Sequence, residues 1–206
     1  MTEYYLETDD YDPNVWVGVP LKWPMPGFEK EIPDIPAWAD AAANALWDAS
    51  TLTPHPGELD QLAGTLGYAA ERFPTAYPGF EVLLHLPGPR EIPIPVYIGD
   101  VDVDGDPEAE LRFWTGEDDP NAVEPPVVEE FTSPHLGTGR RVLRYTVDPD
   151  DPSRSIIAAL RYGWYIEELG LVGGMFTLSP EPGRLILAMD DLDTLARGLR
   201  YAPAED

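Results

Sequence analysis

The chain has 206 residues, contains no cysteine, and carries a formal net charge of −25 from 38 acidic and 13 basic residues. This length fits one domain of ordinary size or two small ones, and a content of 43% hydrophobic and 11% aromatic residues supports a packed core rather than a disordered chain. The absence of cysteine excludes disulfides, zinc–thiolate sites, iron–sulfur clusters and thiol nucleophiles.

Apolar runs in the chain extend over only a few residues, whereas a helix that crosses a bilayer needs about 20. The N-terminal residues, Met-Thr-Glu-Tyr-Tyr-Leu-Glu-Thr-Asp-Asp, are acidic and contain no apolar segment of the secretion-signal type. We therefore expect a cytoplasmic protein that does not engage a membrane.

The acidic charge limits the class of partner. It repels DNA, RNA and anionic membranes, so nucleic acid is an unfavourable partner, and a basic protein is the partner that the charge favours. Compositional bias is the alternative explanation, because only two of the 13 basic residues are lysine while alanine, glycine and proline are abundant. That skew is typical of GC-rich bacterial coding sequences, and the charge then serves solubility alone.

Residues 1–36 read as an irregular segment, interrupted by prolines, that covers part of the core and contains one short strand over residues 14–19. A helix is expected over residues 37–50, because Trp38 and four alanines share one stripe at helical spacing. These alanines are Ala41, Ala42, Ala45 and Ala49.

A second helix is expected over residues 58–73, where apolar residues follow the i, i+3, i+4, i+7 pattern. Gly64 and Gly67 weaken this helix by about 1 kcal/mol each, and Pro74 is expected to end it. The apolar positions are Leu59, Leu62, Ala63, Leu66, Ala70 and Phe73. We expect the leucines of this stripe, together with Trp38, to lie in the core.

Residues 80–206 read mainly as antiparallel strands followed by a closing helix. Strands are expected over residues 80–86, 94–98, 110–114, 127–131, 141–147, 155–167, 174–178 and 184–189. Residues 156–163 also fit a helix, and the alternation at residues 162, 164 and 166 favours a strand for the second half of 155–167. Turns are expected at residues 104–105, 138–139, 149–152 and 171–175. Asp190 or Asp191 is expected to cap the last helix. The apolar face of that helix consists of Leu192, Leu195, Ala196 and Leu199.

These elements predict an α+β fold, in which an antiparallel sheet packs with two N-terminal helices and a short C-terminal helix. No Gly/Ser linker and no repeat of fixed period divides the chain, so residues 1–206 are expected to form a single domain. Over residues 127–200, the order of strands followed by a helix that contains Leu192-Asp193-Thr194-Leu195-Ala196 resembles the PsbP/Mog1-like proteins. That resemblance implies a binding or accessory role rather than catalysis.

The acidic residues are concentrated in one stretch. Twelve acids and a single base, Arg112, lie between Asp100 and Glu130, and residues 140–144 then read Arg-Arg-Val-Leu-Arg. A fold that brings the two segments together neutralises part of the acidic stretch, whereas a fold that separates them leaves a dipolar surface. We predict that the residues that bind a basic partner are Glu117, Asp118, Asp119, Glu129 and Glu130.

Residues 100–111 begin like an EF-hand calcium loop, with carboxylates at Asp100, Asp102 and Asp104 followed by Gly105. The pattern then fails, because the twelfth position, where a bidentate glutamate belongs, is leucine. An acidic hairpin with its turn at Asp-Gly is the alternative that we favour. We therefore predict no metal ligands, while a calcium-dependent structural protein stays a hypothesis.

No sequence signature of catalysis is present. His55, His85 and His135 lie far apart in the sequence, and no Gly-x-Ser-x-Gly, Walker A or Gly-x-Gly-x-x-Gly motif occurs. An enzyme therefore requires histidines and acids that converge from distant segments. The six tryptophans suit either a ligand platform or the core, and the core is the interpretation that we favour.

We therefore expect a non-enzymatic acidic protein-binding or accessory module, of adaptor, chaperone or immunity type, with a basic protein partner and no cofactor. The first alternative is a hydrolase with a site assembled from dispersed acids and histidines. The second is a calcium-dependent structural protein that uses the loop from Asp100 to Asp106.

Overall fold

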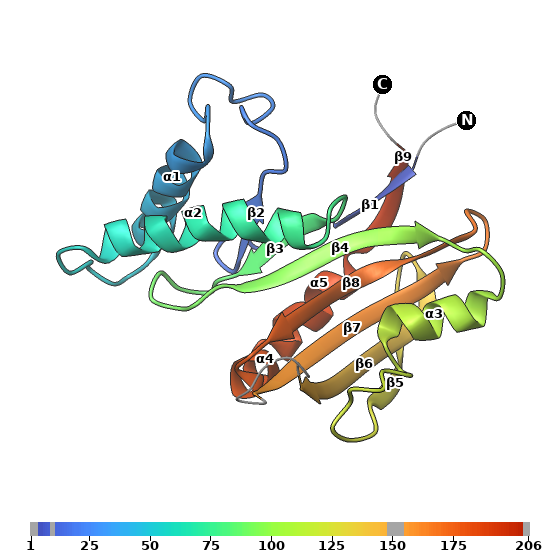
Figure 1. Ribbon diagram of the computed structural model, residues 1–206. Coiled ribbons are helices and arrows are strands. Elements are labelled where there is room, and N and C mark those ends of the chain that lie inside the picture. The colour runs from blue at the N-terminus through green and yellow to red at the C-terminus, as the bar shows by residue number, and fades with distance from the viewer. Residues whose placement is uncertain (1–3, 9–10, 148–154, 204–206) are drawn as a thin grey trace. The chain divides into compact units, whose positions relative to one another are not determined.

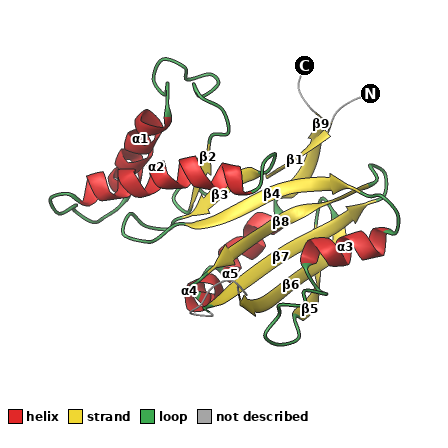
Figure 2. Ribbon diagram, in the orientation of Figure 1, coloured by secondary structure: helices red, strands yellow, loops and turns green. Residues whose placement is uncertain are grey.

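The structure is a computed structural model that describes residues 4–8, 11–147 and 155–203. The chain divides into two compact units. The larger unit comprises Met1–Tyr11 and Val96–Asp206, and the smaller unit comprises Asp12–Pro95. Figure 1 labels the elements of both units, and Figure 2 distinguishes their helices from their strands.

The smaller unit is built from a two-stranded antiparallel ladder and a pair of helices. Its elements are β2 (Trp16–Val19), α1 (Ile35–Ala49), α2 (Glu58–Ala76) and β3 (Glu81–His85). In the ladder Trp16 lies opposite His85, and the two rings meet edge to face with centroids 5.0 Å apart. The short strand and the two helices predicted for this part of the chain are confirmed.

Helix α1 begins where Asp34 caps it, because the carboxylate accepts the backbone N–H of Ala37 at 3.0 Å and a proline occupies the first turn. The predicted alanine stripe is wrong, since Ala41, Ala45 and Ala49 are exposed. The face that is buried instead carries the large side chains, whose burial stabilises the fold more than that of alanine. It consists of Trp38, Ala39, Ala43, Leu46 and Trp47.

Helix α2 buries Leu62 and Leu66, as predicted, and leaves Leu59 half-buried. The prediction that Pro74 ends this helix is wrong, because the helix continues to Ala76. A proline lacks the N–H that would bond to the carbonyl four residues earlier. In the last turn of α2 the missing N–H costs only one backbone hydrogen bond, at a helix end where other carbonyl groups already lack a partner within the helix.

The proline-rich stretch between β2 and α1 has no strand or helix over residues 20–33, as expected. Within the smaller unit it covers α1, because the ring of Trp23 meets the ring of Trp38 edge to face with centroids 6.3 Å apart. The prediction of an irregular N-terminus is wrong for residues 4–8. They form a strand whose partner lies at the other end of the chain, a pairing that local pattern does not reveal.

The larger unit contains an antiparallel sheet in the order β4-β8-β7-β6-β5 and a separate ladder of β1 with β9. Its elements are β1 (Tyr4–Thr8), β4 (Ile94–Asp102), α3 (Pro107–Thr115), β5 (Val127–Ser133), β6 (Gly137–Val147), β7 (Ile156–Ile166), β8 (Leu171–Ser179), α4 (Pro182–Leu187), α5 (Met189–Arg197) and β9 (Leu199–Pro203). The α+β class is confirmed, as are the four strands predicted between residues 127 and 178.

Two predicted strands are helices. Residues 107–115 form α3, because Asp106 caps the helix, a proline follows, and Gly116 ends it in the left-handed conformation with φ +70°. Residues 182–187 form α4, which also begins with a proline. Both segments are apolar enough for a strand. The capping residues of α3 select a helix, whereas α4 has a proline in its first turn and no side-chain cap.

Three of the predicted turns lie elsewhere. Residues 104–105 belong to the connection between β4 and α3 rather than to a hairpin. Residues 138–139 lie in β6, and residues 171–175 lie in β8, so the turns that connect these strands are 134–136 and 167–170. The predicted turn at 149–152 falls outside the described residues.

Helices cover both faces of the sheet in the larger unit (Figure 1). Neighbouring residues of a strand point to opposite faces, and Gly163 of β7 lies against Trp114 of α3 while the hydroxyl of Tyr162 bonds to Asp193 of α5. Gly163 allows α3 to approach closely, because a Cβ there would overlap the side chains of α3. Among the described residues, no helix has the length and apolar content that crossing a membrane requires.

Candidate functional site

The predicted partner-binding acids lie close to arginines of β6 and α3. Arg140 extends from β6 to two carboxylates, bonding Glu117 at 2.9 Å and also Glu108 at the start of α3. Glu117 additionally accepts the hydroxyl of Thr115 at 3.0 Å. These contacts tie the loop after α3 to the sheet.

A second arginine of β6 is buried against the same loop. Arg144 is only 7% exposed, and it reaches Asp119 at 2.6 Å and the carbonyl oxygen of Gly116 at 3.1 Å. Asp118 points elsewhere and pairs with Arg112 of α3 at 2.6 Å. The three consecutive acids of this loop therefore each contact a different arginine.

The opposite face of β6 carries Arg141, which contacts Glu129 of β5 at 2.6 Å and Asp193 of α5 at 2.7 Å. Asp193 also accepts the hydroxyl of Tyr162 at 2.6 Å. Burial raises the pKa of the Tyr162 phenol above its ordinary value, so this group stays protonated and acts as a hydrogen-bond donor. The cluster holds α5 against the sheet.

The fold thus brings residues 140–144 together with the acidic stretch. Of the five predicted partner-binding acids, Glu117, Asp118, Asp119 and Glu129 contact arginines within the larger unit. Glu130 is exposed and has no ion pair in the part of the chain that the structure describes. Glu117 and Asp119 are half-buried in these contacts, whereas Asp118 and Glu129 are exposed.

Glu130 lies on β5, the last strand of the sheet in the larger unit. One side of β5 pairs with β6, and no described strand pairs with its other side. Val127 and Val128 are 52% and 46% exposed. A strand edge of this kind presents unpaired backbone N–H and C=O groups to another chain.

A shallow hollow of about 380 Å³ lies beside this edge. It is lined by Glu108, Leu111, Val128, Glu129, Glu130, Thr138, Gly139 and Arg140. Glu130 lies directly opposite Arg140 in the ladder, although the guanidinium of Arg140 bonds to the two acids named above. We call Val127–Ser133 and this hollow the β5 edge.

The loop that begins like an EF-hand does not form a hairpin turn, so that prediction is wrong. Asp100 and Asp102 lie within β4, which pairs with β8, and the carboxylate of Asp106 caps α3. Burial raises the pKa of the Asp100 carboxyl above its usual value. Among the described residues, no group of three or more histidine, cysteine, aspartate or glutamate side chains is arranged to hold a metal ion.

The histidines occupy three different environments. His55 is exposed before α2, and its backbone N–H donates to Glu58 at 2.7 Å. His85 is buried in β3 at 5% exposure, and His135 is exposed in the turn between β5 and β6. His55 and His85 belong to the smaller unit and His135 to the larger one. The hydrolase stays a hypothesis.

The tryptophans lie in the core, as predicted, apart from Trp23, which is half-buried. The buried ones are Trp16, Trp38, Trp47, Trp114 and Trp164. Trp114 and Trp164 also bond through their ring nitrogens, to the carbonyl oxygens of Tyr162 and Gly137 respectively. The five buried tryptophans therefore stabilise the fold and are not exposed as a ligand platform.

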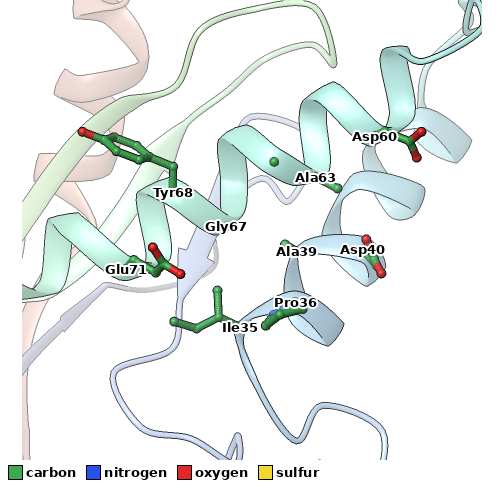
Figure 3. Close-up of a pocket in the computed structure, with 10 residues that line it drawn as sticks. Ile35, Pro36, Ala39, Asp40, Asp60, Ala63, Gly67, Tyr68 and Glu71 are labelled. Carbon is green, nitrogen blue, oxygen red and sulfur yellow. The ribbon is translucent and has the colours of Figure 1, made fainter.

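A second candidate surface, which sequence reasoning missed, is a groove of about 450 Å³ between α1 and α2 (Figure 3). We call it the α1–α2 groove. Its lining residues are Ile35, Pro36, Ala39, Asp40, Asp60, Ala63, Gly64, Gly67, Tyr68 and Glu71. The α2 residues recur at positions 60, 63, 64, 67, 68 and 71, which is one face of a helix. That second stripe is visible in the sequence beside the leucine stripe.

Comparison of this chain with protein-family models, with curated proteins and with solved structures finds no match. The resemblance to the PsbP/Mog1-like proteins therefore stays a prediction.

Proposed function

We propose that this protein is a non-enzymatic acidic protein-binding or accessory module, and that a basic partner binds along the β5 edge. The observation that carries the proposal is the unpaired outer side of β5 among the described residues. An extended segment of a partner can add to such an edge through main-chain hydrogen bonds. The resemblance to the PsbP/Mog1-like proteins points in the same direction.

The chemistry of the edge favours a basic segment with apolar residues. Val127 and Val128 are exposed and offer apolar contact, while Glu130 offers a carboxylate that no described residue pairs. The net charge of −25 attracts a basic chain over a longer range and repels phosphate. A second copy of this chain fits poorly, because antiparallel pairing of β5 with itself about its central residue places Glu130 against Glu130.

The proposal is tested with the full chain and a fluorescent peptide of about eight residues, a typical strand length, in which valine and lysine alternate. A peptide with glutamate in place of lysine is the matched control. We expect the lysine peptide to bind and its association rate to fall as salt is raised, because exposed charges are screened over about 8 Å at physiological ionic strength.

A pair of variants locates the binding. Glu130→Lys is expected to weaken the lysine peptide several-fold, whereas Glu168→Lys, at an exposed acid in the turn between β7 and β8, changes affinity by less than about twofold. Equal effects of the two variants, binding of both peptides alike, or no binding of the lysine peptide at low salt would overturn the proposal.

A further inference from the structure

We infer that the α1–α2 groove is a separate docking surface, and that its occupant is a basic amphipathic helix of a protein partner. The groove lies entirely within the smaller unit, whereas the β5 edge lies in the larger unit. The inference rests on the shape of the groove floor, on the acids along its rim and on its exposed apolar residues, and it holds whether or not the β5 edge binds a partner.

The floor of the groove is made of small residues, which let the backbone of another helix approach. A Cβ placed on Gly64 would meet no atom within 4 Å, and one on Gly67 would meet only the Cβ of Ala39, at 3.8 Å. Ala63 is half-buried beside them. Helices pack about 8–10 Å apart depending on the side chains at their contact, and small residues favour the short end of that range.

The rim is acidic. Asp40, Asp60 and Glu71 are exposed, and none of them makes an ion pair with another described residue. No arginine or lysine lines the groove. The nearby guanidinium of Arg72 lies over the ring of Tyr68, 5.8 Å from the ring centroid. The rim therefore offers three carboxylates to lysine or arginine side chains, which supplies the charge complementarity that selects a basic partner.

The spacing of the acids suits a helix. Asp60 and Glu71 lie at opposite ends of the groove (Figure 3), three turns apart on α2, which is about 16 Å along the axis. A partner helix that runs along α2 can form ion pairs with both acids when its basic residues are also about three turns apart. Because the backbone bonds of α2 are formed within the helix, an extended segment finds no hydrogen-bonding edge here.

Apolar contact comes from Tyr68, which is 58% exposed, and from the half-buried Ile35. Tyrosine is among the residues that contribute most to protein interfaces. A second copy of this chain is a poor occupant, since two such grooves would oppose three carboxylates with three carboxylates. A basic helix of another protein can approach the small residues of the floor closely and can pair its lysines or arginines with the carboxylates of the rim.

The probe is a synthetic peptide of about 18 residues, long enough to form a helix, rich in alanine and leucine, with lysines on the polar face. A peptide with glutamate at the lysine positions is the matched control. Binding to the full chain is measured by isothermal titration calorimetry. We expect the lysine peptide to bind and the glutamate peptide not to bind.

A leucine side chain at position 64 meets open space, so it enters the groove without disturbing the fold. Leucine also has a higher helix propensity than glycine, so Gly64→Leu is expected to leave the melting temperature unchanged or to raise it. The variant is expected to weaken the lysine peptide about tenfold or more, as loss of a central interface contact does. Ala45→Leu, at an exposed position of α1 outside the groove, is the control and is expected to leave affinity unchanged.

The charges are tested with matched triple variants. Asp40→Asn, Asp60→Asn and Glu71→Gln together are expected to weaken the lysine peptide about tenfold at low salt, since exposed pairs contribute roughly 0.5 kcal/mol each. The control combines Glu31→Gln, Asp48→Asn and Asp104→Asn, which are exposed acids outside the groove. It is expected to change affinity less than about twofold, the effect of long-range charge alone.

Three results would overturn the inference: no binding of the lysine peptide, equal losses in the two triple variants, or binding that Gly64→Leu leaves intact. A dimer that Gly64→Leu dissociates, measured by analytical ultracentrifugation, would assign the groove to a second copy instead. Glu130→Lys separates this inference from the proposed function, because it is expected to weaken the strand peptide and to leave the helical peptide unaffected.

Discussion

At the scale of single residues, the arginines of β6 determine what the acidic stretch does. Arg144 is 7% exposed, and its charge is balanced by Asp119 and by the carbonyl oxygen of Gly116. Gly116 has a φ of +70°, a conformation that favours glycine, and a Cβ there would also force the guanidinium to move. Acids that look solvated in the sequence are part of the structure here.

We predict that Asp119→Asn lowers the free energy of unfolding by about 3 kcal/mol, because it leaves the buried Arg144 charge without its carboxylate. The double variant Asp119→Asn with Arg144→Met is expected to be more stable than Asp119→Asn alone, since it removes the unpaired charge. Urea denaturation of the four proteins in the cycle measures the coupling. Additive effects would show that the pair does not interact in the folded state.

The pH dependence of the smaller unit is predicted from Glu58. A hydrogen bond from Arg90 lowers the pKa of Glu58 from 4.5 to about 2. A carboxyl whose folded pKa is depressed stabilises the protein above its unfolded pKa, and that stability is lost as the pH falls through the folded pKa. The melting temperature of Glu58→Gln is therefore expected to lie below that of the parent at pH 7, and the gap should close between pH 4.5 and about 2.

The control for this experiment is Glu31→Gln, at an exposed acid without an ion pair among the described residues. Its difference from the parent should be small and independent of pH over the same range. A gap for Glu58→Gln that is constant down to pH 2 would show that the Arg90 contact does not stabilise the charged carboxylate.

At the scale of elements, α2 carries two stripes with different roles. Leu62 and Leu66 are 4% and 0% exposed and belong to the core. We predict that Leu62→Ala lowers the free energy of unfolding by about 2–5 kcal/mol, the range for truncating a buried leucine. The exposed neighbour Gln61→Ala should change it by less than about 0.5 kcal/mol. Equal effects in chemical denaturation would place the leucine face outside the core.

The packing of α3 on β7 depends on Gly163. A Cβ there would overlap side chains of Trp114, Leu111 and Thr115. We predict that Gly163→Ala costs about 1–3 kcal/mol of stability through overpacking. Gly183→Ala, at a helical glycine with open space around it, is expected to be neutral or stabilising. Thermal melts of the two variants test the difference, and a stable Gly163→Ala protein would contradict the close approach of α3.

Element boundaries followed local signals where these were unambiguous. Helix α2 was predictable from the spacing of its leucines, which face the core. Helix α1 and strands β5 to β8 were predicted near their observed positions, although α1 buries another stripe than the one predicted and β7 and β8 bury both faces. Helix α3 was mistaken for a strand because its nine residues are few and its apolar residues are close together. The capping signal of Asp106, Pro107 and Gly116 was present in the sequence and outweighs that pattern.

At the scale of the whole molecule, the prediction of a single cooperative domain awaits measurement. The boundary between the two compact units falls within β4, which runs without interruption from Ile94 to Asp102. At this boundary the chain passes from one unit to the other within a strand. We expect tryptophan fluorescence and far-UV circular dichroism to report one thermal transition at the same temperature. Two transitions, or a stable proteolytic fragment that corresponds to one unit, would contradict this.

The sequence by itself determined the α+β class, the core leucines of α2, the buried tryptophans and the absence of thiol chemistry. These follow from composition and from periodicities that act over a few neighbouring residues. The same reasoning selected five partner-binding acids from their density along the chain. Density does not indicate which carboxylates are available to a partner, because an acid is neutralised by any base that the fold brings near it.

Only the tertiary structure shows which of these acids lie against a base. Arg140 and Glu117 lie 23 positions apart in the chain, yet Nη1 of Arg140 lies 2.9 Å from Oε1 of Glu117. Charge attraction depends on the distance in space and on burial, so its outcome is unknown until distant segments are in contact. Four of the five predicted acids contact arginines in the fold, Glu130 lies on a strand edge, and two helices form an acidic groove. That groove depends on how two helices pack, which no single segment of the sequence specifies.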